Sequence, residues 1–241
     1  SMSPLATLLR KSIQEQESDN APHLIVEARA GTGKTTTLIE GLKLLKGIRV
    51  SIEPSPQQKA IWDQMFLSRD AKSICFVAFN KSIATELQQR VPPGCEAMTM
   101  HSMGFRAVTK ALGRHEPNSW VVQDIIADLL GKDLRELRRD SRMMIVVKAT
   151  EQLVSLCKQN LIDDAYPTNT EMGAREGICN TDKVTELWWA EQLDALASHY
   201  DVDLNGSKLQ VYNLVPRVLE RCKSPQGKIT FDDMIWLPIA L

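Results

Sequence analysis

The sequence predicts an α/β fold in which a parallel sheet carries an inserted all-helical subdomain. Two continuous apolar runs, "HLIVEA" (23–28) and "SICFVAF" (73–79), are rich in β-branched or aromatic residues, as buried parallel strands usually are. Each run leads into a helical pattern, and strands that alternate with helices indicate a parallel sheet. From about residue 113 to 223 the strand-like runs disappear and only helical periodicity remains.

Strand and helix patterns follow one another along the first half of the chain. The first run leads into "GKTTTLIEGLKLL" (33–45), and the second leads into "NKSIATELQQRV" (80–91). The sequence Pro-Pro-Gly at 92–94 marks a turn. After this turn, "CEAMTMHSMGFRAV" (95–108) predicts a third strand that continues into a helix.

The second half of the chain predicts a series of helices. Apolar residues recur at helical spacing in "VVQDIIADLL" (121–130), which is followed by Gly131, a common helix terminator. Further helices are expected within 143–162 and 181–200. The stretch "LVPRVLERC" continues the pattern, and we expect Pro216 to open or kink its helix.

The composition is that of a globular protein with a sizeable core, because 43% of the 241 residues are hydrophobic and 24% are charged. A net charge of -1 excludes a wholly basic nucleic-acid binder, although a local basic groove is compatible with it. Five scattered cysteines without a CxxC pair indicate reduced thiols rather than a zinc site or a disulfide framework. No apolar run reaches the length of a membrane span, so we expect no membrane partner and a cytoplasmic location.

Residues 28–36 have the pattern of a phosphate-binding loop between a strand and a helix. Gly31 and Gly33 would let backbone N–H groups approach phosphate oxygens. Lys34 would reach the β- and γ-phosphates, and the Thr35 hydroxyl would hold Mg²⁺; we expect both to be catalytic. The strict pattern GxxxxGK[ST] has glycine where this chain has alanine. The residues expected to hold the nucleotide are Ala28, Arg29, Ala30, Gly31, Thr32, Gly33, Lys34, Thr35 and Thr36.

Three stretches in this order resemble the N-terminal motor domain of superfamily 1 helicases of the UvrD/Rep-like group: "ARAGTGKTTTL", "FVAFNKSIATEL" and "TMHSMGF". In that family the phosphate loop commonly begins with alanine, as it does here. The resemblance implies a P-loop NTPase fold of the RecA-like type, with ATP and Mg²⁺ as cofactors. It also implies single-stranded DNA and a second motor domain as partners, with ATP hydrolysis coupled to translocation and unwinding. The ATP-binding domain would then comprise 1–112 and 224–241, and the inserted helical subdomain 113–223.

The same resemblance places the second and third stretches, the family's motifs Ia and Ib, along the path of single-stranded DNA. An aromatic face there would stack on bases, and polar side chains would contact sugar and phosphate. Core packing is the alternative for the aromatic residue, and a structural role with satisfied hydrogen bonds is the alternative for the histidine. The residues assigned to this path are Phe79, Asn80, Lys81, Thr99, His101 and Ser102.

Two further features of the helical region allow more than one interpretation. In "KDLRELRRDSR" (132–142) four cations would line one helical face and could follow a DNA backbone, although the interspersed acids favour a solvated surface. Of the adjacent Trp188 and Trp189, one is expected to pack and the other to be partly exposed. The four cations are Lys132, Arg135, Arg139 and Arg142.

The glutamine that reads adenine in the family normally lies upstream of the phosphate loop. Gln14 and Gln16 are upstream but lack the usual Pro/Gln setting. Gln57 and Gln58, in "SPQQKAIWDQM" (55–65), have a more similar setting but lie after the loop, where a surface amphipathic helix is the favoured interpretation.

The carboxylate that positions the attacking water should follow an apolar strand. Asp163 and Asp164 follow only two apolar residues, and Asp232 and Asp233 precede their apolar run, so neither pair fits. In the family a stretch resembling "ITFDDMIWLPIAL" (229–241) comes shortly before the missing strand. We therefore expect the chain to stop short of this strand and to hydrolyse little ATP alone. Alternatives are another P-loop enzyme of the kinase or clamp-loader type, or a non-catalytic nucleotide- or DNA-binding module.

Overall fold

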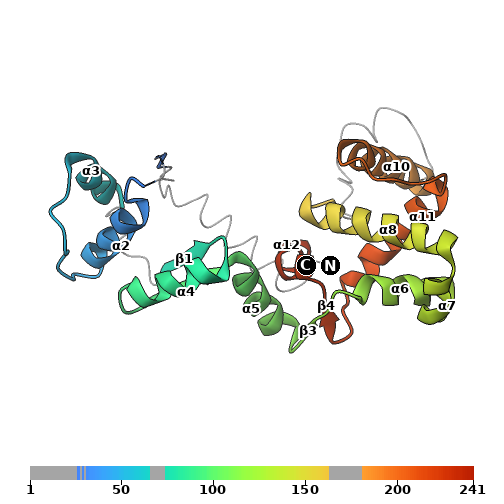
Figure 1. Cartoon of the computed structure of the whole chain (residues 1–241), viewed down its shortest axis with the longest axis horizontal. Helices are drawn as coiled ribbons and strands as arrows, with labels where there is room; N and C mark the ends of the chain where they lie inside the picture. Colours follow the sequence, from blue (N-terminus) through green and yellow to red (C-terminus); the bar gives the residue numbers. More distant parts are fainter. Residues whose placement is uncertain (1–25, 28, 30, 66–73, 163–180) are drawn as a thin grey trace. The chain divides into compact units, whose positions relative to one another are not determined.

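The computed structural model describes residues 26–27, 29, 31–65, 74–162 and 181–241. They belong to two compact units, one that ends at Met103 and one that runs from Gly104 to Leu241 (Figure 1). Each unit has its own hydrophobic core. The elements of the first unit are α2 (Lys34–Leu45), α3 (Pro56–Met65), β1 (Ile74–Ala78), α4 (Lys81–Arg90), β2 (Cys95–Thr99) and the first residues of α5 (Met100–Leu112). The second unit contains the rest of α5 and β3 (Glu116–Pro117), α6 (Val121–Leu130), α7 (Leu134–Arg139), α8 (Ser141–Gln159), α10 (Thr181–His199), α11 (Lys208–Cys222), β4 (Lys228–Ile229) and α12 (Phe231–Ala240).

The sheet of the first unit is parallel, as the sequence predicts. β1 and β2 pair in register, from Ile74 opposite Cys95 to Ala78 opposite Thr99. α4 forms the crossover between them, because parallel neighbours need a connection longer than a tight turn. The predicted succession of strand, helix, strand and helix over 74–108 is therefore confirmed. The core of this unit consists of Ile39, Ala78, Ala84 and Leu87.

The first predicted strand, "HLIVEA", is only partly covered by the described residues. Val26 and Glu27 are described and are not in a strand, and the other residues of the run lie outside the described ranges. The expectation of a strand before the phosphate loop stays a prediction.

α3 packs against α2, the helix that follows the predicted phosphate loop. Trp62 is 3% exposed, and its Nε1–H donates to the carbonyl of Thr37 at 2.7 Å. Its ring lies so close to Gly41 that a Cβ there would be 2.7 Å from the indole Cδ1. Gln58 Nε2 donates to the Thr37 hydroxyl at 3.0 Å. The amphipathic helix expected over 55–65 is present, and its buried face is fixed to α2.

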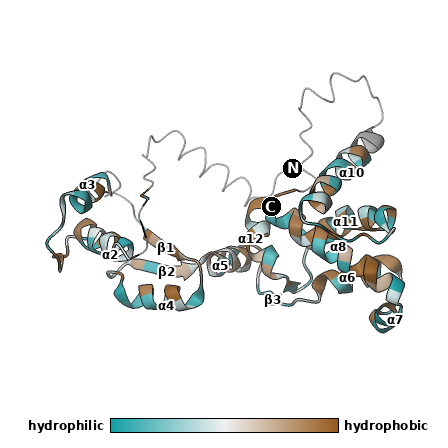
Figure 2. Ribbon diagram, turned by 45° about the horizontal axis from the view of Figure 1, so that its top comes forward, coloured by the Kyte–Doolittle hydropathy of each residue, from teal (hydrophilic) through white to brown (hydrophobic). Residues whose placement is uncertain are grey.

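Helices from the whole length of the second unit contribute to its core. Figure 2 shows α6 mostly in the brown of hydrophobic residues, and Gly131, with φ 62°, ends this helix as predicted. Trp189 is buried and its neighbour Trp188 is half-buried, which confirms the expected division of the pair. The fully buried residues of α6, α8, α10 and α11 include Ile126, Leu153, Leu193 and Val215, one from each helix.

Two details of this unit differ from the prediction. Glu116–Pro117 (β3) pairs in parallel with Lys228–Ile229 (β4), so 113–223 is not entirely helical. Strands of two residues carry no periodic signal, which is why the sequence pattern misses them. Pro216 lies inside α11, which begins at Lys208, so it does not open the helix.

The charged stretch 132–142 is not one helix, contrary to the expectation of a single positive face. α7 ends at Arg139, and Asp140 is extended with φ -86° and ψ 103° before α8 begins. Asp133 and Asp140 each accept hydrogen bonds from backbone N–H groups of the turn that follows. Aspartate stabilises a helix at the N-cap and competes with the backbone inside one, so the stretch divides into two capped helices.

Within the second unit, α5 and α12 touch through backbone atoms. A Cβ on Gly104 of α5 would lie 1.9 Å from the carbonyl oxygen of Met234 in α12. No side chain fits into that distance, so only glycine allows this approach of the two helices.

Candidate functional site

The loop that leads into α2 contains two glycines in the left-handed region. Gly31 has φ 77° and Gly33 has φ 76°, which other residues rarely adopt. A Cβ on either glycine would meet nothing within 4 Å, so the backbone conformation rather than packing requires them. Thr32 stabilises the bend, because its hydroxyl donates to the carbonyl of Arg29 at 2.8 Å. All four residues belong to the phosphate loop that the sequence predicts, together with Ala28 and Ala30, which lie outside the described residues.

The first turn of α2 combines backbone donors with a lysine. Gly33 occupies the N-cap, so no side chain caps this turn. Lys34 and Thr35 are exposed and Thr36 is half-buried. The Lys34 ammonium donates to the carbonyl of Arg29 at 2.9 Å, which holds the positive charge beside the loop. Backbone N–H groups at the positive end of a helix and a nearby cation suit a phosphate group, so the residues present fit a nucleotide.

A buried carboxylate fixes α2 to the segment after it. The side chain of Glu40 is 7% exposed, and its Oε1 lies 2.6 Å from Lys43 Nζ. Oε2 accepts the backbone N–H of Ser51 at 2.7 Å. Burial raises the pKa of Glu40, but the hydrogen bonds from Lys43 and Ser51 outweigh it and hold that pKa below its ordinary value. Together with α3, this contact sets the position of the helix behind the loop.

The residues predicted for the DNA path follow the two strands of the first unit. β1 ends at Ala78 and β2 ends at Thr99, and these residues are opposite each other in a parallel pair. The chain therefore leaves the sheet at the same edge after each strand. At this edge the structure brings together Phe79, Asn80, Lys81, Thr99, His101 and Ser102.

The segment after β1 presents an aromatic ring and a cation. Phe79 is 97% exposed, so the alternative of core packing is wrong for this residue. Lys81 is exposed at the start of α4. Asn80 caps that helix, since its Oδ1 accepts the N–H of Ile83 at 2.9 Å. Its side-chain amide nitrogen remains a donor that a ligand oxygen can use.

The segment after β2 presents compact polar groups. Thr99 Oγ1 accepts the N–H of Ser102 at 3.1 Å and lies 2.9 Å from the Ser102 hydroxyl. His101 is exposed in the first turn of α5, so its ring is accessible to a ligand. This edge of the sheet can therefore offer an aromatic face, a cation and several hydrogen-bonding groups to a ligand.

Asp232 and Asp233, which the order of the sequence excludes as the catalytic carboxylate, lie in the first turn of α12 and have structural partners. Asp233 Oδ2 accepts from the N–H and the hydroxyl of Thr230, each at 2.8 Å, in a capping box. Its Oδ1 lies 2.7 Å from Lys158 Nζ, and these two side chains are 2% and 1% exposed. Asp232 Oδ2 accepts from the Ser155 hydroxyl at 2.6 Å. β4 ends at Ile229, and both aspartates lie in the first turn of the helix that follows, so neither stands at the end of an apolar strand, as the sequence predicts.

Of the remaining candidates for the catalytic acid and the adenine-reading glutamine, only Gln57 and Gln58 lie among the described residues. Asp163 and Asp164, like Gln14 and Gln16, lie outside the described residues. Gln57 is exposed on α3, whereas Gln58 donates to the Thr37 hydroxyl and so anchors α3 to α2.

Comparison with known proteins gives one family. The family model described as "UvrD/REP helicase N-terminal domain" matches residues 10–241. No curated protein and no solved structure gives a significant match. Across the described ranges, no helix is both long and apolar enough to cross a membrane.

Proposed function

The chain belongs to the UvrD/REP helicase N-terminal domain family, and we propose that it is the ATP-binding motor domain of a DNA helicase that moves along single-stranded DNA. This family has a P-loop NTPase fold and uses ATP, generally with Mg²⁺. The observation that carries the proposal is the loop with two left-handed glycines that precedes the uncapped first turn of α2.

The proposed nucleotide site is the loop and first turn at residues 28–36. Backbone N–H groups and the Lys34 ammonium would stabilise the β- and γ-phosphates, and the exposed Thr35 hydroxyl would hold Mg²⁺. The metal would neutralise charge on the phosphates. Support comes from the hydrogen bond between Lys34 and Arg29, which keeps the ammonium at the loop before any ligand arrives.

The proposed DNA path runs along the carboxyl edge of β1 and β2. Phe79 would stack on a base and Lys81 would neutralise a phosphate. Asn80, Thr99, His101 and Ser102 would donate to sugar or phosphate oxygens. Support comes from the 97% exposure of Phe79, because a phenyl ring left in water has no role in the core of this unit.

Further parts of the proposal concern organisation. We assign the ATP-binding domain to 1–112 and 224–241 and an inserted helical subdomain to 113–223, and we expect a cytoplasmic location. A second motor domain would complete the ATP site with arginines, and such an arginine can be worth about 10³–10⁵ in rate.

Lys34→Ala tests the nucleotide site. Removing the ammonium takes away the main positive charge on the β/γ-phosphates, so a fluorescent ATP analogue should bind at least about tenfold more weakly. Lys46→Ala, at the opposite end of α2, is the matched control and should bind like the parent. Thr35→Ala should mainly reduce the Mg²⁺ dependence of binding. Equal binding by Lys34→Ala and the parent would exclude this loop as the site.

Phe79→Ala and Lys81→Ala test the DNA path by titration of a labelled oligothymidylate. Loss of a base stack weakens binding by about 1–3 kcal/mol and leaves the salt dependence unchanged. Loss of a phosphate contact lowers the slope of log K against log salt by about 0.7. Unchanged binding and slope in both variants would exclude this edge of the sheet.

A non-catalytic nucleotide- and DNA-binding role is the second candidate. It is favoured by the residues that follow β1 and β2, because neither strand is followed by a carboxylate that could position water. Phosphate release by residues 1–241 with saturating single-stranded DNA, with Lys34→Ala as background, tests whether this chain contains its own catalytic acid. A motor domain that needs a second domain and a non-catalytic module both predict little release from this chain alone. We expect release close to background. Robust DNA-stimulated turnover would show that a catalytic acid lies within the chain, with Asp163 and Asp164 the first candidates.

A further inference from the structure

Trp120 and Arg138 form a preassembled stack on the surface of the second unit. The guanidinium carbon of Arg138 lies 4.5 Å from the centre of the Trp120 ring. Trp120 is nevertheless 51% exposed, so much of the indole is open to solvent. An exposed tryptophan with a guanidinium on one face presents a flat surface for a third planar group.

Both members of the stack are held in place by further contacts. The backbone N–H of Trp120 donates to Asn118 Oδ1 at 2.7 Å, which fixes the turn before α6. Arg138 Nη2 donates to Gln123 Oε1 at 3.2 Å. Gln123 is in turn anchored, because its Nε2 donates to Glu151 Oε2 at 3.1 Å. A ligand would thus find the ring and the guanidinium already ordered.

Two further arginines extend the positive charge from this stack. On α7, Arg135 lies three residues before Arg138, and Arg139 directly follows Arg138. Leu137, 1% exposed, marks the inner side of the helix, and the three arginines lie on the outer side. We call Trp120, Arg135, Arg138 and Arg139 the Trp–Arg surface.

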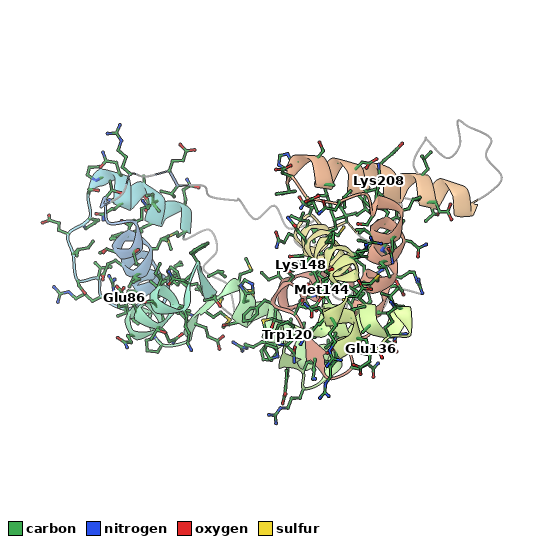
Figure 3. The ribbon with its side chains drawn as sticks, turned by 45° about the vertical axis from the view of Figure 1, so that its right-hand side comes forward. Glu86, Trp120, Glu136, Met144, Lys148 and Lys208 are labelled. Carbon is green, nitrogen blue, oxygen red and sulfur yellow. The ribbon has the colours of Figure 1, made fainter. Side chains whose placement is uncertain are left out.

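The acids of this region offset only part of that charge. The carboxylates of Asp133 and Asp140 accept backbone N–H groups at helix N-termini, where the positive end of the helix compensates them. Glu136 is on the side of α7 away from Arg138 but lies three residues before Arg139, so it offsets part of the charge of Arg139. Asp124 is exposed in the first turn of α6. Figure 3 shows Trp120 and Glu136 at the same end of this unit and Lys208 at the other.

We propose that the Trp–Arg surface binds single-stranded nucleic acid, with a base stacked on Trp120 and phosphates bound by Arg135 and Arg139. Single-stranded nucleic acid fits both parts of this surface. An exposed indole can stack on an accessible base face, which a duplex covers with its neighbouring base pairs. The arginines can bind the phosphates on either side of that base. An acidic protein could pair its carboxylates with the arginines, but its charge gives no reason for the exposed Trp120 ring. The inference rests on the proposed function for its DNA substrate and adds a second contact on residues that the family resemblance did not mark.

The test is anisotropy titration of the full 241-residue chain with a labelled oligothymidylate. Trp120→Ala should bind about tenfold more weakly, as expected for one lost stack, with the same salt dependence. Trp120→Phe should retain most of the affinity. The double variant R135Q/R139Q should reduce the slope of log K against log salt by about 1.4, twice the value for one phosphate contact on a single strand. Lys208→Gln, at the other end of the unit, is the control and should leave both quantities unchanged.

Photo-crosslinking of the unmodified chain gives a readout that does not depend on how a variant folds. A 5-iodouracil oligonucleotide should cross-link to the peptide that contains Trp120, and excess unlabelled oligothymidylate should suppress the product. A cross-link confined to Phe79, with unchanged titrations for the Trp–Arg variants, overturns this inference and leaves the proposed function intact. Sensitivity of the Trp–Arg variants with no effect of Phe79→Ala supports the inference and refutes the proposed path along the sheet. Equal competition by duplex DNA or polyglutamate, or no oligonucleotide binding at all, also overturns the inference.

Discussion

The buried pair of Lys158 and Asp233 gives the sharpest prediction about stability. Lys158→Met keeps the aliphatic stem but leaves the Asp233 carboxylate, whose side chain is 2% exposed, without its cation. The ammonium also lies 3.4 Å from both Cys222 Sγ and Thr230 Oγ1, so all three of its donors have partners. Removing one member of a buried pair costs about 3–5 kcal/mol, and we expect the free energy of unfolding of the second unit to fall by that amount.

Urea unfolding followed by circular dichroism measures this loss. Lys148→Met is the matched control, because Lys148 is an exposed lysine of the same helix and should change stability by less than about 0.5 kcal/mol. The double variant K158M/D233N removes both charges and keeps an acceptor for Thr230, so it should recover part of the loss. A loss below about 1 kcal/mol in Lys158→Met, or a double variant less stable than either single one, would refute the reasoning.

The pH dependence of this difference follows from the pKa of Lys158. Burial lowers that pKa, but Cys222 and Asp233 outweigh burial and place it above its ordinary value. A lysine whose pKa is raised on folding contributes stability fully below its unfolded pKa of about 10.4, and loses it as pH rises through the folded value. The difference in the free energy of unfolding between the parent and Lys158→Met should therefore be constant through neutral pH and narrow in alkali.

Three further predictions concern other positions. Gly104→Ala should destabilise the second unit by at least about 1–3 kcal/mol, because a Cβ would lie 1.9 Å from the Met234 carbonyl oxygen; Ala111→Gly, at an exposed position of the same helix, should lose only about 1 kcal/mol in the same urea assay. Folding lowers the pKa of Glu40, so the ionised carboxylate stabilises the protein above its unfolded pKa, and this stabilisation is lost as the pH falls through the folded pKa. Glu40→Gln should therefore lose less stability than the parent below about pH 4.5. Thermal unfolding at a series of pH values checks this, and the same pH dependence in parent and variant would contradict it. Burial raises the pKa of Cys157 to about 12 and that of Cys222 to about 11, so a thiol reagent at neutral pH should modify exposed Cys75 first and these two only on unfolding, as peptide mapping would report.

Local signals in the sequence were sufficient for much of the first unit. The run at 74–78 is continuously apolar, and Asn80, two residues after it, is a favoured N-cap, so both the strand and the start of α4 were predictable. Gly31 and Gly33 indicated a bent loop, because glycine readily adopts the positive φ that both residues have in the structure. These features depend on residues within one turn of each other.

Contacts between distant residues were not predictable in this way. Trp120 and Arg138 stack only because α6 and α7 fold against each other, and neither residue was singled out from the sequence. The approach of Gly104 to Met234 joins residues 130 positions apart, and the glycine alone is compatible with an ordinary helix. The single positive face expected over 132–142 failed because periodicity was counted across Asp140, where a cap ends the repeat.

The two aspartates of α12 show how far a sequence pattern can distinguish a catalytic carboxylate from a structural one. A carboxylate beside an apolar run can follow a strand and serve chemistry, or precede a helix and cap it. The order distinguishes the two, because the free N–H groups and the positive end of a helix attract acids to its first turn. Here Thr230 stands three residues before Asp233 and an apolar run follows, which is the pattern of a capping box. That pattern was readable from the sequence and assigns Asp233 to the fold; its pairing with Lys158, 75 positions earlier, required the folded chain.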